Sequence, residues 1–352
     1  MEPQKIVYTQ TAGKALSELI TQLKPDRTFV LTDETTAQLC LPHIADSVCL
    51  SEENHIVIKP GDEHKTLQSL AHVWDCLQQR GATRHSLLVN LGGGMVTDLG
   101  AFAAATFKRG IDCINIPTTL LAMVDASVGG KTGINFGGLK NEVGVFRNAS
   151  AVIIDTSFLD TLDDANRLSG FAEMLKHGLI ANHDMLAQLL SCNITDTAGC
   201  SQMAKLVADS VAVKQRIVTE DPTEQGVRKA LNLGHTIGHA FESLALRRQH
   251  PVLHGYAVAW GLMAELYLCC TKTGFPTSIM RQVVNFIVGH YGRMDITCND
   301  YDELLELMTH DKKNVGTTIN FSLLADVGQL RLNQTATKEE IEEALDFYRD
   351  GQ

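Results

Sequence analysis

Two histidines four residues apart, His235 and His239, form the most informative pattern in this sequence, and His254 follows them closely. On a helix such a pair shares one face, with Cβ atoms roughly 5–6 Å apart. Neutral imidazole is a common metal ligand. Gly234 and Gly238 precede the two histidines and would leave room for a bulky group to approach. His254 precedes a run of small residues that predicts a helix start, where the helix dipole should keep its imidazole neutral.

A carboxylate completes this pattern. Glu173, Lys176 and His177 form a polar stripe on an otherwise apolar helical segment. Two histidines and one glutamate would leave a divalent cation with an open position for substrate oxygens. We therefore predict a catalytic metal centre. The alternative is a hydrogen-bonded core pair of histidines or a chance pair on the surface.

A glycine-rich turn indicates a phosphate site. Residues Leu91-Gly92-Gly93-Gly94 follow a predicted strand and open a predicted helix, whose N-terminus favours a phosphate group. Tight packing is the alternative reason for these glycines. Asp33, directly after the first predicted strand, is placed to bind a ribose hydroxyl by analogy with dinucleotide folds. Its alternative role is that of a helix N-cap or turn residue.

Cationic residues gather in two further regions. The run from Pro117 to Asn141 contains Lys131 and Lys140 among small and polar residues, which favours phosphate binding over a plain surface loop. Lys176, Lys214, Arg228 and Asn232 form a second set. We expect Arg228, Asn232 and the two histidines to occupy successive turns of one helix face, a combination suited to a polyhydroxylated acid phosphate. The alternative is a solvated face.

Composition limits the function classes. The 352 residues have room for two domains, and the net charge of −11 argues against nucleic-acid or anionic-membrane partners. The most apolar stretch, residues 257–270, contains Glu265 and is too short to span a bilayer, so we expect a buried helix. No signal peptide is predicted. The nine cysteines include no C-x-x-C pair, which is typical of a reducing cytoplasm.

The predicted elements divide the chain in two. Strands are expected at residues 28–32, 55–58, 86–91, 111–116 and 151–155, with helices at 67–80 and 96–107. This alternation predicts an α/β, Rossmann-like parallel sheet covered on both faces. From about residue 162 helical segments follow, at 163–181, 199–219, 226–246, 255–272 and 277–291, with one β patch at 317–324. We therefore predict a Rossmann-like domain at 1–160 and a mainly α-helical domain at 161–352.

Together these motifs resemble the 3-dehydroquinate synthase family, in family order from about residue 30 to 315. The resemblance is carried by Gly92-Gly93-Gly94…Asp98, Arg109-Gly110, Pro117-Thr118-Thr119, Gly129-Gly130-Lys131, Lys140-Asn141, Glu173…Lys176, Glu224…Arg228…Asn232, Gly234-His235…Gly238-His239, His254-Gly255 and Asp311-Lys312-Lys313.

The resemblance implies a shikimate-pathway lyase that binds NAD and a divalent metal, zinc or cobalt, in a cleft between two domains. It implies conversion of 3-deoxy-D-arabino-heptulosonate 7-phosphate to 3-dehydroquinate and phosphate. The implied steps are transient oxidation by NAD, phosphate elimination, re-reduction and intramolecular aldol closure. A homodimer is also implied, in which Arg109 reaches the site of the neighbouring subunit.

The resemblance also implies residue roles. The implied metal ligands are Glu173, His235 and His254. The implied NAD-binding residues are Asp33, Asp62, Lys65, Gly93, Gly94, Asp98, Thr118, Thr119, Asp125, Lys131, Lys140, Phe158, Thr161 and Leu162. The implied substrate-binding and catalytic residues are Lys131, Asn141, Lys176, Lys214, Arg228, Asn232, His239 and either Lys312 or Lys313.

Three segments depart from the family pattern near the implied NAD site. Asp163-Asp164-Ala165-Asn166 replaces Pro-x-Arg-Glu, Leu139 replaces a glycine, and Gly61-Asp62-Glu63-His64-Lys65 leaves either Asp62 or Glu63 as the acid. Three other functions compete: a sibling cyclase acting on a heptulose or hexose phosphate, a metal-dependent polyol dehydrogenase, and a non-catalytic metalloprotein. The presence of Lys214, Arg228 and the Lys312-Lys313 pair favours the acid substrate.

Overall fold

The computed structural model describes residues 4–48, 50–137, 139–194, 201–309 and 319–351. The chain divides into two compact units, Met1–Asp163 with Asp196–Gln215, and Asp164–Thr195 with Arg216–Gln352. The segment Asp196–Gln215 thus belongs to the first unit, although the predicted helical domain includes it. In the part of the chain that the structure describes, no helix is both long and apolar enough to cross a membrane.

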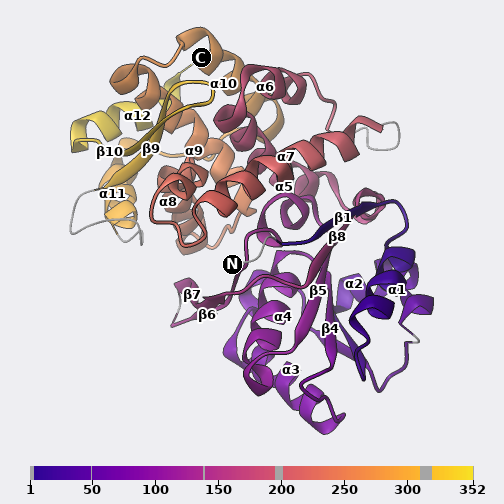
Figure 1. Ribbon diagram of the computed structural model, residues 1–352. Helices are drawn as coiled ribbons and strands as arrows, with labels where there is room; N and C mark the ends of the chain where they lie inside the picture. The colour runs from indigo at the N-terminus through magenta and orange to yellow at the C-terminus, as the bar shows by residue number, and fades with distance from the viewer. Residues whose placement is uncertain (1–3, 49, 138, 195–200, 310–318, 352) are drawn as a thin grey trace. The chain divides into compact units, whose positions relative to one another are not determined.

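The first unit contains a six-stranded parallel sheet with the order β1-β8-β5-β4-β2-β3. Figure 1 labels β1, β8, β5 and β4 of this sheet. Its strands are β1 (Ile6–Thr9), β2 (Thr28–Asp33), β3 (His55–Ile58), β4 (Leu87–Gly92), β5 (Asp112–Pro117) and β8 (Ala151–Asp155). The five predicted strands are confirmed. Strand β1 was not predicted, because this edge strand has four residues and none of them is fully buried.

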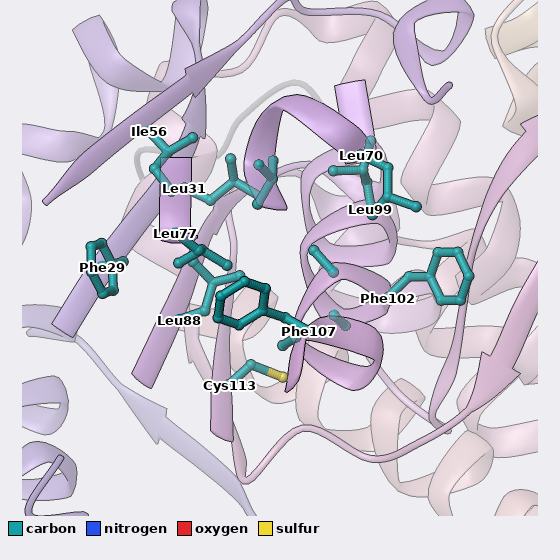
Figure 2. Packing of buried hydrophobic residues seen from close by; sticks show 14 of the residues in the cluster. Phe29, Leu31, Ile56, Leu70, Leu77, Leu88, Leu99, Phe102, Phe107 and Cys113 are labelled. Carbon is teal, nitrogen blue, oxygen red and sulfur yellow. The ribbon is translucent and has the colours of Figure 1, made fainter. Parts of the chain in front are cut away.

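Helices cover both faces of this sheet. The helices are α1 (Ala12–Leu23), α2 (Glu34–Leu39), α3 (Leu67–Gln79) and α4 (Gly94–Thr106), with 3-10 turns η1 (Leu41–His43), η2 (Ala45–Ser47), η3 (Asp62–His64), η4 (Phe107–Arg109) and η6 (Thr156–Thr161). Alternate strand residues such as Phe29, Leu31 and Leu88 join Leu70, Leu99 and other side chains of α3 and α4 in one core (Figure 2). The intervening Val30, Leu87 and Val89 are also buried, as expected when the opposite face is covered.

The run from Pro117 to Asn141 is ordered rather than a plain loop. It forms the π-helical turn η5 (Ala122–Ala126) and then enters an antiparallel hairpin of β6 (Lys131–Phe136) and β7 (Leu139–Phe146). No strand was predicted here. Every described residue of β7 is exposed. The strand therefore does not show the alternation of buried apolar and exposed polar residues by which a half-buried strand is recognised.

The second unit is mainly helical, as predicted. Its elements are α5 (Asp164–Ala181), α6 (His183–Leu190), the end of α7 (Ser201–Glu220), η7 (Val227–Asn232), α8 (His235–Arg247), α9 (His254–Leu268), η8 (Cys269–Thr273), α10 (Thr277–Tyr291), η9 (Cys298–Asp300), α11 (Tyr301–Thr309), α12 (Lys338–Asp350) and a hairpin of β9 (Asn320–Asp326) and β10 (Gln329–Thr335). Helix α9 is the expected buried apolar helix and packs against α5, α8, α10 and α12.

One predicted helix of this unit is wrong. The segment 226–246 breaks at Leu233 and Gly234, where the 3-10 turn η7 ends and α8 begins. Gly234 has a φ of 78°, a left-handed conformation that glycine adopts without strain and that a continuous helix excludes. Arg228 and Asn232 therefore do not lie on the same helix face as His235 and His239.

Candidate functional site

Glu173, His235 and His254 converge within the second unit. Glu173 projects from α5, whereas His235 and His254 are the first residues of α8 and α9. Oε1 of Glu173 lies 3.3 Å from Nε2 of His235 and 3.5 Å from Nε2 of His254. Three ligand atoms from three separate helices thus point toward one another.

The other nitrogen of each imidazole has its own partner. Nδ1 of His235 lies 3.1 Å from the backbone oxygen of Leu233, and Nδ1 of His254 lies 3.3 Å from Oε2 of Glu242. These contacts fix the ring orientations and leave both Nε2 atoms for another ligand. Metal-binding histidines are held in the same way, by a carbonyl or carboxylate at the second nitrogen.

The Glu173 carboxylate is fully buried, and the described residues give neither oxygen a hydrogen bond of standard geometry. The Lys176 ammonium contacts it. Burial alone would raise the pKa of Glu173, but Lys176 and His235 hold it well below its usual range. A buried, ionised carboxylate facing two imidazole nitrogens fits the ligand set of a divalent cation such as zinc.

The two histidines differ in charge. Burial and the nearby Lys176 lower the pKa of His235 to about 3, so its ring is neutral. Burial also opposes a charge on His254, but the neighbouring carboxylates of Glu173 and Glu242 raise its pKa to about 10. This direction is opposite to the neutral His254 that we expected from its place at a helix N-terminus, because two carboxylates face the ring. A metal at Nε2 would have to displace this proton.

The glycines beside the histidines have a different role from the predicted one. A Cβ on Gly234 would lie 2.7 Å from Leu262, and one on Gly238 would lie 2.8 Å from the backbone oxygen of Ala257. Both neighbours belong to α9. These glycines therefore admit the adjacent helix rather than a bulky ligand.

Further predicted substrate residues lie in the same unit. The ring of His239 is centred 5.2 Å from that of His235 and 5.8 Å from that of His254. Nitrogens of all three histidines lie within 4.8 Å of one another, which offers a second possible ligand set. Asn232 donates to Oε1 of Glu224 at 3.0 Å. Lys312 and Lys313 lie outside the described residues.

Arg228 is buried and held by its surroundings. Its Nη1 donates to the backbone oxygen of Pro222 at 2.7 Å, and its backbone N–H donates to Asp221 at 3.0 Å. Asp221 also accepts the N–H groups of Gln225 and Gly226. The solvated-face alternative for Arg228 is therefore wrong, since the side chain is 2% exposed.

In the first unit, the predicted nucleotide residues gather at the carboxyl ends of neighbouring strands. Asp33 ends β2, the glycine turn ends β4, and Thr118 follows β5. From β2 the chain continues to β3 on one side, whereas β4 leads to β5 on the other. Such a reversal of strand order marks the ligand-binding crevice of open α/β sheets. Gly93 is the N-cap of α4, so free backbone N–H groups lie at this point.

Side chains around this edge are already engaged with one another. Oδ1 of Asp33 caps α2 by accepting from the backbone N–H of Thr36 at 2.7 Å, which agrees with the N-cap alternative. Thr119 accepts from the N–H of Ala122 at 3.1 Å. Thr161 donates to the backbone oxygen of Phe158 at 2.7 Å, and Leu162 ends η6.

A buried lysine joins several of the other predicted residues. Lys65 donates to Asp98 at 3.0 Å, contacts Asn141, and lies 3.7 Å from Asp62. Lys140 lies 3.4 Å from Asp62. Burial raises the pKa of Asp98, and Lys65 opposes that shift. Of the two candidate acids in this segment, Asp62 is the one that contacts these lysines.

Four predicted residues remain, of which Lys214 and Asp125 lie close enough to Asp98 to influence its pKa. Lys214 donates to Oδ1 of Asp125 at 2.6 Å, and Lys131 is exposed at the start of β6. Arg109 is exposed in η4, just before β5, with a left-handed φ of 70°. It lies at the amino edge of the sheet, opposite the edge that carries Gly93 and Thr118.

Sequence reasoning missed three carboxylates that hold this framework together. Glu242 contacts His254, Asp221 binds the loop before Arg228, and Glu265 of α9 accepts backbone N–H groups of α8. Glu265 carried a signal, because it is a lone charge within an apolar helix.

Both halves of the chain match models of one family. Residues 55–169 match the 3-dehydroquinate synthase N-terminal model, and residues 170–314 match the 3-dehydroquinate synthase C-terminal model. A 3-dehydroquinate synthase of Parabacteroides distasonis is 54% identical over 350 residues, covering 99% of each chain.

Solved structures agree with this fold. A 2-deoxy-scyllo-inosose synthase complexed with carbaglucose-6-phosphate, NAD+ and Co2+ superimposes with a TM-score of 0.82 at 22% identity, over 99% of this chain and 96% of that one. A 2-epi-5-epi-valiolone synthase from Streptomyces hygroscopicus, with NAD+ and Zn2+ bound, also gives 0.82 at 22% identity, over 100% and 98%.

Proposed function

The chain belongs to the 3-dehydroquinate synthase family, and we propose that it converts 3-deoxy-D-arabino-heptulosonate 7-phosphate to 3-dehydroquinate and phosphate, as a carbon–oxygen lyase. The observation that carries this proposal is the convergence of Glu173, His235 and His254 at a buried point, in a chain whose two halves match the two models of that family.

We assign the divalent cation, zinc or cobalt, to Glu173 Oε1 and to Nε2 of His235 and His254. We assign NAD to the carboxyl edge of the parallel sheet, with Gly93 and Gly94 at the phosphates. When bound, the cation polarises a substrate oxygen and NAD reversibly accepts hydride. The remaining NAD contacts proposed are those of Asp33, Asp62, Lys65, Asp98, Thr118, Thr119, Asp125, Lys131, Lys140, Phe158, Thr161 and Leu162.

The polar residues near the histidines would bind the substrate. Arg228 offers a planar guanidinium suited to a carboxylate or phosphate, and Lys176 offers a compact charge. Such contacts confine a flexible sugar acid to one reactive conformer before phosphate leaves and the ring recloses. The other residues proposed for this role are His239, Asn232, Asn141, Lys131, Lys214 and Lys312.

We also propose a homodimer in which Arg109 serves the site of the partner subunit. Its position at the amino edge of the sheet, away from Gly93 and Thr118 of its own chain, supports this role. Exposed apolar side chains on the β6–β7 hairpin, among them Phe136, Leu139 and Phe146, are a candidate contact surface. Light scattering of the purified protein should give twice the mass of the chain.

The test mixes metal-loaded protein with a catalytic amount of NAD and the heptulosonate phosphate, and follows phosphate and NADH together. Many turnovers of phosphate release without net NADH, with 3-dehydroquinate as the product, would support the proposal. Stoichiometric NADH would instead identify a dehydrogenase. Activity only with a neutral heptulose or hexose phosphate would identify a sibling cyclase. We also propose a reducing compartment such as the cytoplasm, which the nine cysteines without a C-x-x-C pair support.

A further inference from the structure

Helix α8 begins at His235, and the glycine before it offers no side chain to cap the helix. The first backbone N–H groups of a helix have no partner within the helix, and a side chain at the N-cap usually accepts one of them. Gly234 is the N-cap of α8 and has no side chain. A larger residue is excluded, because a Cβ at this position would lie 2.7 Å from Leu262.

A neighbouring helix supplies the missing acceptor. Oε2 of Glu265 accepts the N–H of Gly234 at 2.6 Å, and Oε1 accepts the N–H of Ile237 at 3.0 Å. Glu265 lies on α9 and is fully buried. These hydrogen bonds require α8 and α9 to approach closely. Gly261 of α9 permits this approach, because a Cβ on it would lie only 2.0 Å from the backbone oxygen of Gly234. The buried carboxylate also meets the positive end of the α8 dipole.

His235 lies between the two N–H groups that Glu265 binds. The two hydrogen bonds hold the backbone on both sides of His235, and this backbone sets the direction in which the imidazole leaves the helix. The Leu233 carbonyl that contacts Nδ1 of His235 belongs to the same turn. Rotation of this turn would move Nε2 away from Glu173.

We propose that Glu265 is a positioning residue of the metal centre. Its carboxylate, on α9, binds the N-terminal N–H groups of α8 and thereby fixes the orientation of His235. This inference rests on the proposed function, because it assumes that His235 binds a metal. The two hydrogen bonds of Glu265 described above go to backbone N–H groups and not to the imidazole of His235. Its effect should therefore appear in metal affinity and in the geometry of the bound ion.

The variant that tests this is Glu265→Gln, which keeps the size of the side chain. The amide oxygen can accept one N–H, but the amide nitrogen then faces the other and leaves it unpaired. The matched control is Asp155→Asn in the first unit. Asp155 is also buried and accepts the N–H groups of Ala12 and Ser157 at 2.8 and 3.0 Å, and it belongs to the unit that does not contain the proposed metal ligands.

The full-length metal-free protein and both variants are titrated with Co2+ alone, and the visible spectrum of the bound ion and the thermal midpoint are recorded. We expect Glu265→Gln to weaken Co2+ binding by about tenfold or more and to alter the Co2+ spectrum. Asp155→Asn should lower the thermal midpoint while leaving Co2+ affinity and spectrum unchanged.

Two results would overturn the inference. One is Co2+ affinity of Glu265→Gln within twofold of the parent with the same spectrum. The other is an equal loss of affinity in both variants, which would tie metal binding to global stability. If Glu265→Gln does not fold, Glu265→Asp, which keeps the charge but shortens the reach, is judged by the same criteria. Failure of the parent protein itself to bind Co2+ would instead refute the proposed metal site.

Discussion

Nδ1 of His254 lies 3.3 Å from Oε2 of Glu242, a residue twelve positions earlier and on a different helix. The contact joins the start of α9 to the middle of α8. It decides which imidazole nitrogen remains available, because a nitrogen that donates to a carboxylate cannot also bind a metal.

Replacing this carboxylate should weaken the metal site. We expect Glu242→Gln to lower zinc affinity by about tenfold to a hundredfold, because the amide makes His254 a weaker ligand and holds it less firmly. Competition with a chromophoric chelator measures the affinity. Glu303→Gln removes an exposed partner of Arg247 and serves as the control. Equal zinc affinity in all three proteins would remove Glu242 from this role.

Arg228 should matter for substrate and not for metal. We expect Arg228→Ala to raise KM and lower kcat, with a loss of transition-state stabilisation of about 2–5 kcal/mol, since it removes a charged hydrogen-bond donor from a buried position. Steady-state kinetics and metal content are measured on the same preparation. Arg228→Lys keeps the charge and shows whether the planar guanidinium is needed. Unchanged kinetics in Arg228→Ala would exclude Arg228 from the site.

Asp221 should stabilise the loop before Arg228 in a pH-dependent manner. Burial favours its neutral form, but the backbone N–H groups that it accepts lower its pKa overall. A lowered pKa in the folded chain means that the stabilisation is present at neutral pH and is lost as the pH falls through that value.

We therefore expect Asp221→Asn to reduce the free energy of unfolding by about 1–3 kcal/mol at neutral pH, with a smaller difference from the parent in acid. Urea unfolding of both proteins at pH values from neutral down to about 3 measures this, a range that passes below the usual aspartate pKa. A difference that stays constant across the series would contradict the charge-based explanation.

Two helical glycines should respond oppositely to alanine. A Cβ on Gly261 would meet the backbone oxygen of Gly234 at 2.0 Å, whereas one on Gly289 of α10 would meet nothing within 4 Å. We expect Gly261→Ala to lower stability by about 1–3 kcal/mol or more. Gly289→Ala should raise it by about 0.5–1 kcal/mol through helix propensity. Thermal unfolding compares the two, and tolerance of Gly261→Ala would refute the close α8–α9 contact.

The cysteines should differ in reactivity. Cys113 is buried in the sheet core, and burial raises the pKa of its thiol to about 12, whereas Cys298 is exposed. Because the thiolate is the reactive species, a maleimide at pH 8 should label Cys298 rapidly and Cys113 only after unfolding. Peptide mass spectrometry resolves the two sites. Rapid labelling of native Cys113 would show that this core opens.

The residues proposed to carry the chemistry, and most of the elements that hold them, could be identified from the sequence. The strands β2, β3, β4, β5 and β8 were predictable because their residues are apolar and bounded by turn residues. Likewise, the apolar residues around Glu265 predicted a buried helix. These signals are local, since hydrophobic periodicity within one segment reports how that segment is buried.

The way in which the segments meet could be seen only in the folded chain. The sequence could not show that Gly234 ends one turn and starts another helix, or that Glu265 of α9 caps it. Nor could it show that the carboxylates of Glu173 and Glu242 both face His254 and raise its pKa. Each of these depends on contacts between different segments of the chain. The hydrophobic periodicity of one segment does not show which other segments pack against it.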